Sequence, residues 1–357
     1  MKVSCIVPVY NTSSFLHKAI SSILKQTYQD FEIILINDAS TDYSKEICLL
    51  YSATYPDKIV FIDKKVNEGV DKARFTGIDY VLKNNPGGSI TFLDSDDYLS
   101  ECAFEKLVSE MKSSNADVVE MRFNRIMGPI RKKAKILTPA QRIAQPVLFD
   151  DYYISFFGVN RLSVNLCGKL FKTDLFANSD IQPTGFRMGE DLMLMMELFP
   201  QIQRYSVIDY FGYNYRWGGL TSGYNPYFWD NLVTQFWLKR QKAIENNYLK
   251  AIPTLIIELK NVLLTNISSQ IIYQKKSEEE IKKWISSQIG NNPLWDDIRE
   301  DPIETRDKRY NTPIFSAIAR GDVEYIFAVA RERVHQTRHR RKLIGLVYSA
   351  LKLIKVL

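Results

Sequence analysis

The stretch SITFLDSDDY (residues 89–98) joins an apolar run to three carboxylates that lie within four residues. Carboxylates this close together repel one another unless a cation or another positive group offsets their charge. In sheets of parallel strands, ligands bind beyond the carboxyl ends of the strands, which is where Asp94, Asp96 and Asp97 stand. The stretch therefore predicts a divalent metal that holds an anionic ligand such as a diphosphate. The alternative is a solvated acidic turn or a helix cap.

The first 125 residues alternate apolar strands with amphipathic helices. We predict the strands over residues 3–9, 31–37, 58–63, 89–93 and 117–123. Apolar residues recur at helical spacing over 15–24 and 73–82. This alternation predicts an α/β fold with a doubly wound, mostly parallel sheet that carries helices on both faces.

The remainder of the chain changes character twice. Residues 124–157 are irregular, with three prolines around the basic cluster 131–135, and we expect a loop or lid there. After the aromatic-rich segment 161–222, helical spacing begins near residue 226. We therefore predict a first domain over 1–225, a helical extension over 226–330 and a basic tail over 331–357.

Histidine and cysteine usage excludes several kinds of site. The chain has three histidines, His17, His335 and His339, and four widely spaced cysteines. This scarcity argues against a histidine-based triad or a multi-histidine zinc site. We expect reduced thiols in a cytosolic protein, and a carboxylate as any general base.

Four motifs recur in a characteristic order: PVYN at 8–11, NDASTD at 37–42, NEG at 67–69 followed by Ala73-Arg74, and FLDSDD at 92–97. This series resembles the family 2 glycosyltransferases of bacterial polysaccharide or glycolipid type, which are inverting enzymes with the GT-A fold. The resemblance implies a nucleotide-binding half over about 1–125 and an acceptor half over about 160–225.

The resemblance also implies donor-side roles for particular residues. Asp94-Ser95-Asp96 would be the Asp-x-Asp signature, in which Asp96 contacts Mn²⁺ or Mg²⁺ and Asp94 contacts the ribose or the metal's water shell. Oxygen ligands of this kind suit both cations. The nucleobase pocket would be lined by Pro8, Tyr10 and Asp38, with Asn67 nearby.

Three later segments resemble further motifs of the family. In MGEDL (188–192), Asp191 would be the catalytic base and Glu190 would position the acceptor; a capping role at a helix N-terminus is the alternative. In NLCGKLF (165–171), Lys169 would face the acceptor or a phosphate, or would be a surface lysine. The segment YNYRWGGLTS (213–222) resembles a loop that closes over the diphosphate, or is a structural aromatic hairpin. There Arg216 suits phosphate and Ser222 is a candidate contact of the acceptor or a phosphate.

The C-terminal tail is basic and amphipathic. Residues 331–357 contain eight Lys or Arg and one Glu. Their net charge of +7 exceeds the net charge of +6 of the whole chain. RHRRK (338–342) precedes an apolar helical pattern over 343–357, which predicts binding to an anionic membrane surface. Packing on the helical extension and an oligomer interface are the alternatives, and no nucleic-acid-binding motif accompanies the charge.

The N-terminus has no signal-peptide pattern, and no apolar run approaches the roughly 20 residues of a membrane span. We therefore expect a cytoplasmic protein that is peripheral on the inner face of the cell membrane. The predicted function is the metal-dependent, inverting transfer of a sugar from a nucleotide-diphosphate donor, with a UDP-sugar as the first candidate. The acceptor would be a hydroxyl of a glycan or of a lipid-linked molecule, in the assembly of cell-surface polysaccharide or glycolipid.

Two rival functions remain. A nucleotide-sugar-binding or scaffold protein would keep the fold without turnover. A sugar nucleotidyltransferase would also need carboxylates at strand ends, together with a glycine-rich basic loop near the first strand, and the sequence shows none there.

Overall fold

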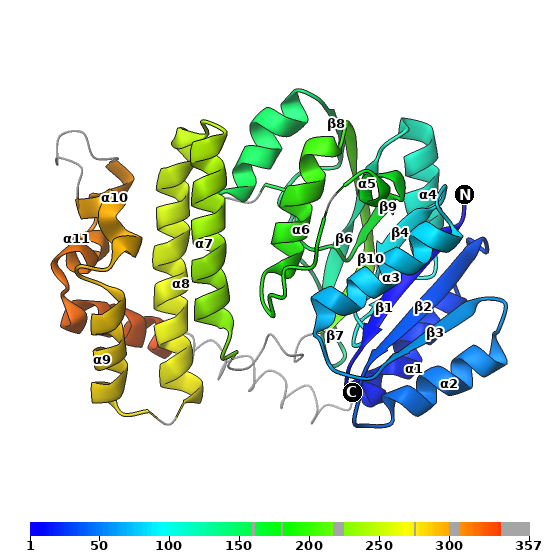
Figure 1. Ribbon diagram of the computed structural model, residues 1–357, viewed down its shortest axis with the longest axis horizontal. Coiled ribbons are helices and arrows are strands. Elements are labelled where there is room, and N and C mark those ends of the chain that lie inside the picture. The colour runs from blue at the N-terminus through cyan, green and yellow to red at the C-terminus, as the bar shows by residue number, and fades with distance from the viewer. Residues whose placement is uncertain (159–160, 180, 217–224, 275, 300–307, 337–357) are drawn as a thin grey trace. The chain divides into compact units, whose positions relative to one another are not determined.

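The computed structural model describes residues 1–336 except 159–160, 180, 217–224, 275 and 300–307. Ser222 and the basic tail from residue 338 onward therefore lie outside the described residues. The chain divides into two compact units, one formed by Met1–Phe156 with Asn160–Gly219 and one by Phe157–Val159 with Leu220–Leu357. Figure 1 shows the sheet of the first unit and the helices of the second.

The first unit is built on one ten-stranded sheet. Its main path has the order β3-β2-β1-β4-β9-β6-β10-β5, with β7 paired to β6 and β8 paired to β10. The strands are β1 (Val3–Val9), β2 (Phe31–Asp38), β3 (Ile59–Lys64), β4 (Ser89–Phe92), β5 (Tyr98–Leu99), β6 (Val118–Met127), β7 (Ile130–Lys133), β8 (Gln141–Ala144), β9 (Lys169–Lys172) and β10 (Arg204–Arg216).

The N-terminal half of the sheet is parallel, as the sequence predicts. β1 pairs in parallel with β2 and β4, and β2 pairs in parallel with β3. Every residue of β1 and β2 is buried, which explains their continuous apolar runs. Because strand order reverses at β1, the carboxyl ends of β1 and β4 border a topological switch point, where ligands bind in such folds.

Helices connect these strands and cover the sheet (Figure 1). Right-handed crossovers place α1 and α2 on one face of the sheet. The connection from β3 to β4 runs in the opposite direction along the sheet, so the same handedness places α3 on the other face. In the first unit the α-helices are α1 (Ser13–Leu24), α2 (Ser44–Thr54), α3 (Val70–Asn84), α4 (Ala103–Ser114), α5 (Asp174–Ala177) and α6 (Glu190–Leu198).

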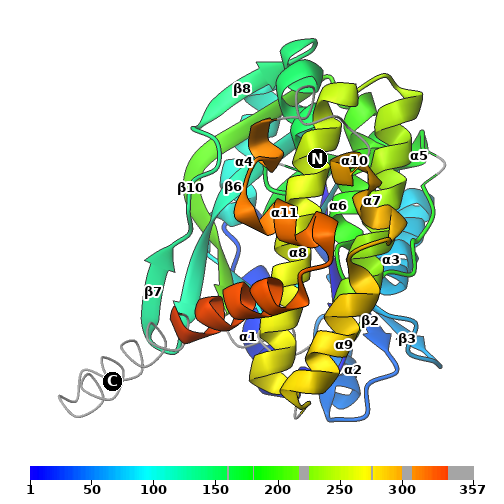
Figure 2. The same cartoon turned by 90° about the vertical axis from the view of Figure 1, so that its left-hand side faces the viewer.

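The expected loop or lid over 124–157 is wrong. β6 continues to Met127 and turns at Gly128-Pro129 into the antiparallel strand β7, and β8 then pairs with β10. Figure 2 shows β7 at the outer edge of the sheet. An edge strand can carry charged residues because its unpaired side faces water, so the basic composition of 131–133 does not prevent pairing.

The second unit is helical. Its α-helices are α7 (Phe228–Glu245), α8 (Ile252–Tyr273), α9 (Glu278–Gln288), α10 (Asp296–Arg299) and α11 (Pro313–Arg320), and residues 323–336 are also helical. The stretch Leu249–Tyr273 has the length and hydropathy of a membrane span, contrary to our expectation from the sequence. Its side chains at Leu255, Leu259 and Leu263 are nonetheless buried inside the protein.

Candidate active site

A buried arginine, Arg74, joins the two acidic motifs. Its Nη2 lies 3.0 Å from Asp94 Oδ1. Its Nη1 lies 3.0 Å from Glu190 Oε1 and 2.6 Å from Asp191 Oδ1. Residues that are 20 and 117 positions away from Arg74 in the sequence thus share one guanidinium. The structure therefore brings the Asp-Ser-Asp and Gly-Glu-Asp segments together.

Arg74 was noted in the sequence only as part of a motif, and its central position was missed. It lies on the buried face of α3 with Ala73, Gly77, Ile78 and Val81, and it is only 3% exposed. An arginine within the apolar stripe of a helix is buried only when it is paired. That signal, available from the helical spacing, points to carboxylate partners.

The cluster carries more negative than positive charge. Asp94, Glu190 and Asp191 surround one guanidinium, so two negative charges are left unbalanced if all three carboxylates are ionised. Burial and the neighbouring Asp191 raise the pKa of Glu190 to about 7. Burial also raises the pKa of Asp191, against the attraction of Arg74. Glu190 is therefore suited to exchange a proton near neutral pH, and the pKa of Asp191 is shifted in the same direction.

The acidic turn after β4 is held by the end of β10. The hydroxyl of Tyr213 donates to Asp97 Oδ2 at 2.8 Å, and the backbone N–H of Arg216 donates to Asp97 Oδ1 at 2.6 Å. Asp97 has no exposed surface, and burial with repulsion from Asp94 raises its pKa to about 8. These bonds give Asp97 a structural role within the acidic turn.

Arg216 lies beside the predicted metal ligand. Its Nε donates to the backbone oxygen of Asp96 at 2.7 Å, and its guanidinium stacks 4.6 Å from the ring centroid of Phe15. Its Nη2 is buried and has no partner among the described residues. An unpaired buried donor is costly, which favours an anionic ligand at this position.

The donor set at Asp94 and Asp96 fits a metal that is shared with a ligand. Among the described residues no group of three His, Cys, Asp or Glu could hold a metal by itself. Burial and repulsion from Asp94 raise the pKa of Asp96 to about 6, so a cation there would relieve an unfavourable charge. Mg²⁺ and Mn²⁺ commonly bind through one or two carboxylates and phosphate oxygens, which suits these residues.

The predicted nucleobase residues stand at neighbouring strand ends. Pro8 is buried in β1, and Tyr10, which follows it, is 42% exposed. Asp38 ends β2 and accepts from the backbone N–H groups of Glu68 and Gly69 at 3.1 and 2.8 Å. These bonds hold the loop that carries Asn67 against the end of β2.

Lys169 is neither a surface lysine nor an exposed ligand contact. It has no exposed surface, its amine donates to the backbone oxygen of Asn165, and it lies 3.7 Å from Glu120 Oε2. Burial lowers its pKa, partly offset by Glu120 and Asp191. The surface-lysine alternative is therefore wrong, and the contacts of Lys169 lie inside the protein.

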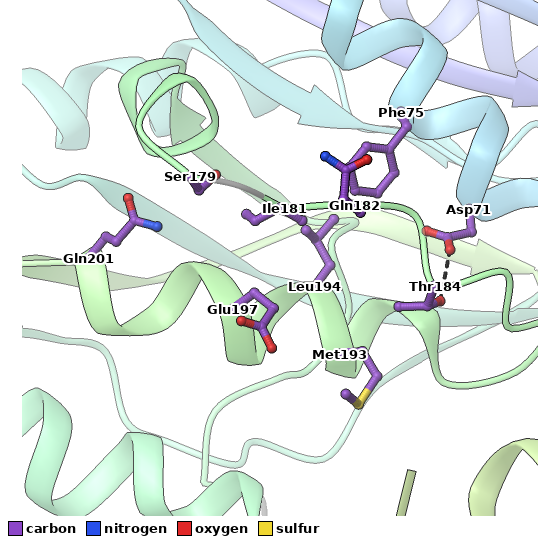
Figure 3. A pocket seen from close by; sticks show the side chains of 10 residues that line it. All are labelled: Asp71, Phe75, Ser179, Ile181, Gln182, Thr184, Met193, Leu194, Glu197 and Gln201. Carbon is purple, nitrogen blue, oxygen red and sulfur yellow. Dashed lines mark hydrogen bonds between the residues drawn. The ribbon is translucent and has the colours of Figure 1, made fainter. Parts of the chain in front are cut away.

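Asp71, near the start of α3, anchors the segment before the Gly-Glu-Asp motif. Its Oδ2 accepts from the hydroxyl of Thr184 at 2.8 Å and from the backbone N–H of Gly185 at 2.9 Å. Figure 3 shows this contact at the border of a cavity of about 310 Å³ that is lined by residues of α3 and α6 and by Ser179, Ile181, Gln182 and Thr184. Asp71 therefore fixes the segment around Thr184 and Gly185 to α3.

Comparisons with known proteins agree with this geometry. The family description "Glycosyl transferase family 2" matches residues 4–165. The chain is 31% identical over 202 residues to glycosyltransferase GlyA of Streptococcus pneumoniae serotype 4, covering 56% of this chain and 28% of GlyA. It is 30% identical over 210 residues to poly(ribitol-phosphate) beta-N-acetylglucosaminyltransferase TarP of Staphylococcus aureus (strain N315), covering 58% of this chain and 60% of TarP.

A solved structure extends the likeness over nearly the whole chain. S. aureus TarS 1-349 in complex with UDP-GlcNAc superposes with a TM-score of 0.60 at 19% identity, covering 94% of this chain and 92% of that one. This likeness confirms the GT-A fold expected from the motifs. The chain spans less than two thirds of GlyA and of TarP. Residues 4–165 form a domain of the family 2 glycosyltransferases.

Proposed function

We propose that this protein transfers a sugar from a nucleotide-diphosphate donor, most simply a UDP-sugar, to a hydroxyl group with inversion at the anomeric carbon. The observation that carries the proposal is the Arg74 cluster, which holds the donor-side carboxylate Asp94 and the candidate base Asp191 on one guanidinium. A scaffold without turnover has no need for this costly convergence of buried charge. A nucleotidyltransferase would not require a second acidic pair at the acceptor side.

In this proposal the residues divide the work between leaving group and nucleophile. Asp96 and Asp94 would hold Mn²⁺ or Mg²⁺, which when bound supplies positive charge to the departing diphosphate. Arg216, with its unpaired buried Nη2, would bind a phosphate oxygen. Asp191 would take the proton of the acceptor hydroxyl. At the same time the hydroxyl oxygen would bond to the anomeric carbon, and the bond from that carbon to the diphosphate would break.

The biological setting of this proposal is taken from the names of the relatives. TarP bears the name of a poly(ribitol-phosphate) transferase, and another relative is named minor teichoic acid biosynthesis protein GgaB. We infer that this chain acts in the assembly of a cell-surface glycan or glycolipid, on a glycan or lipid-linked acceptor. Residues 338–357 would hold it on the inner face of the cell membrane, and their deletion should release the protein from anionic vesicles.

The test compares release of the nucleoside diphosphate from a panel of nucleotide sugars with Mn²⁺ and with EDTA. We expect release to need the metal and to fall by on the order of 10²-fold or more in Asp96→Ala and in Asp191→Asn. Asp79→Asn changes an exposed carboxylate on α3 and serves as the control. Full activity in EDTA would refute the metal, and full activity of Asp191→Asn would refute the base.

A further inference from the structure

The β6–β7 hairpin carries cations that the donor site does not use. Residues 121–149 contain seven Lys or Arg and no Asp or Glu. The two outermost cations meet carboxylates, because Arg122 lies 3.7 Å from Asp209 and Arg142 lies 2.8 Å from Glu110. The five between them are exposed and form no ion pair with a described carboxylate: Arg125, Arg131, Lys132, Lys133 and Lys135.

Two of these cations face each other across the hairpin. In the antiparallel register of β6 and β7, Arg125 pairs with Lys132. Like charges directly opposite each other on neighbouring strands are destabilising, and no described carboxylate relieves this pair. The arrangement therefore weakens the hairpin unless an anion binds there.

The hairpin stands beside the candidate active site. β6 and β10 are parallel, with Phe123 opposite Tyr213, Arg125 opposite Tyr215 and Ile126 opposite Arg216. The ring centroids of Phe123 and Tyr213 are 4.8 Å apart, and Tyr213 donates to Asp97. Because side chains alternate along a strand, Arg125 and its partner across the hairpin share the face of Phe123.

The other face of the hairpin is also basic. Arg131 Nη2 donates to the backbone oxygen of Phe211 at 3.3 Å, and the amine of Lys133 lies 4.5 Å from the centroid of the Phe211 ring. A planar bilayer surface could meet only one face of such a ribbon at a time. A flexible chain with repeated negative charges can contact both faces, so the distribution of charge favours a polymer.

We propose that the β6–β7 hairpin binds a polyanionic acceptor chain, such as a polyol phosphate, and leads it to the catalytic carboxylates. This inference rests on the proposed function, because it assigns the acceptor class of that site. The donor cannot account for the hairpin, since its diphosphate would be met by the metal and Arg216. Five cations in eleven residues that form no ion pair with a described carboxylate suit a ligand with several spaced anions.

The experiment measures binding of a fluorescent oligo(glycerol phosphate) to the full-length chain by anisotropy over a series of salt concentrations. Arg125→Gln/Lys132→Gln should weaken binding by about tenfold or more at low salt and make its salt dependence shallower. Lys106→Gln/Lys112→Gln removes the same charge from exposed positions of α4 and should leave binding unchanged. UDP binding with Mn²⁺ should be unchanged in both variants, which shows that they are folded.

Three results would overturn the proposal. The wild-type chain could fail to bind the oligomer, or the hairpin variant could bind it as tightly as the wild type. The hairpin variant could also lose binding to phosphatidylglycerol vesicles while keeping the oligomer, which would make the hairpin a membrane contact. Failure of the proposed function is distinguishable, since it would show as a wild-type chain that binds the oligomer but neither UDP nor a UDP-sugar.

Discussion

Replacing Arg74 by methionine should destabilise the protein strongly and in a pH-dependent way. Methionine keeps the length and much of the volume of the side chain and removes the positive charge, so the change isolates the ion pairs. Removing one partner of a buried ion pair costs about 3–5 kcal/mol, because the other charge remains uncompensated. The side chains of Asp191 and Glu190 are only 18% and 14% exposed. The side chain of Asp94 is 36% exposed, so water screens its charge better. We therefore place the loss in the free energy of unfolding at about 3 kcal/mol at pH 8, the lower end of this range.

The sign of the pH dependence follows from the raised pKa of the two acids at the start of α6. Glu190 and Asp191 have a higher pKa in the folded than in the unfolded chain, and loss of Arg74 raises both further. A carboxylate with a raised folded pKa contributes stability that is complete below its unfolded pKa. That stability is lost as the pH rises through the folded pKa. The free energy of unfolding of the variant should therefore be closest to that of the wild type near pH 5. It should fall furthest below the wild-type value at pH 8.

The assay is urea unfolding followed by circular dichroism at both pH values. Arg142→Met is the matched control, since Arg142 is 60% exposed and pairs with Glu110. Exposed ion pairs contribute about 0–1 kcal/mol, and this loss should change little between pH 5 and pH 8. A cost for Arg74→Met below 1 kcal/mol, or one of equal size at both pH values, would refute the account of the cluster.

Three further predictions concern single sites. Tyr213→Phe removes the donor to buried Asp97 and should cost about 1–3 kcal/mol in urea unfolding, with nucleotide binding also weakened; an unchanged midpoint would contradict the bond. The kcat/KM of transfer should fall as the pH drops below about 7, the value to which burial and Asp191 raise the pKa of Glu190, and the raised pKa of Asp191 acts in the same direction. A flat pH profile of kcat/KM between pH 5 and 8 would exclude both as the base. Gly77→Ala places a Cβ 2.6 Å from an isoleucine Cγ2 of β1, so unfolding should become easier by about 1–3 kcal/mol, whereas a neutral effect would mean that the helix shifts freely.

The parts of the fold with strong local patterns could be predicted from the sequence. β1 and β2 are buried throughout and appear as continuous apolar runs, so they were located to within one residue. The β6–β7 hairpin was missed because its exposed faces are basic, and no apolar alternation marks the strand 130–133. Pairing of an edge strand depends on its neighbour in space, which a local pattern does not contain.

In the candidate site, too, residues with a local sequence signal could be predicted, and residues whose surroundings depend on distant parts of the chain could not. Asp38, Asp94 and Asp191 could be singled out because each follows a recognisable strand or begins a helix. The burial of Lys169 could not, since its environment is formed by Glu120 and Asn165 from separate parts of the chain. Long-range contacts decide which charged side chains are buried, and a single sequence states them only indirectly.

The charge balance around Arg74 favours function over stability as the reason for the cluster. Buried ion pairs rarely stabilise a fold more than apolar side chains of similar size would, and this cluster does not even balance its own charge. Burial, together with the excess of three carboxylates over one guanidinium, raises the pKa of Glu190 and Asp191. A site with this excess gains stability when it binds a cation or takes up a proton, and both events belong to the proposed transfer. Asp94 is therefore coupled through Arg74 to Glu190 and Asp191. A cation that binds at Asp94 should alter the proton affinity of Glu190 and Asp191.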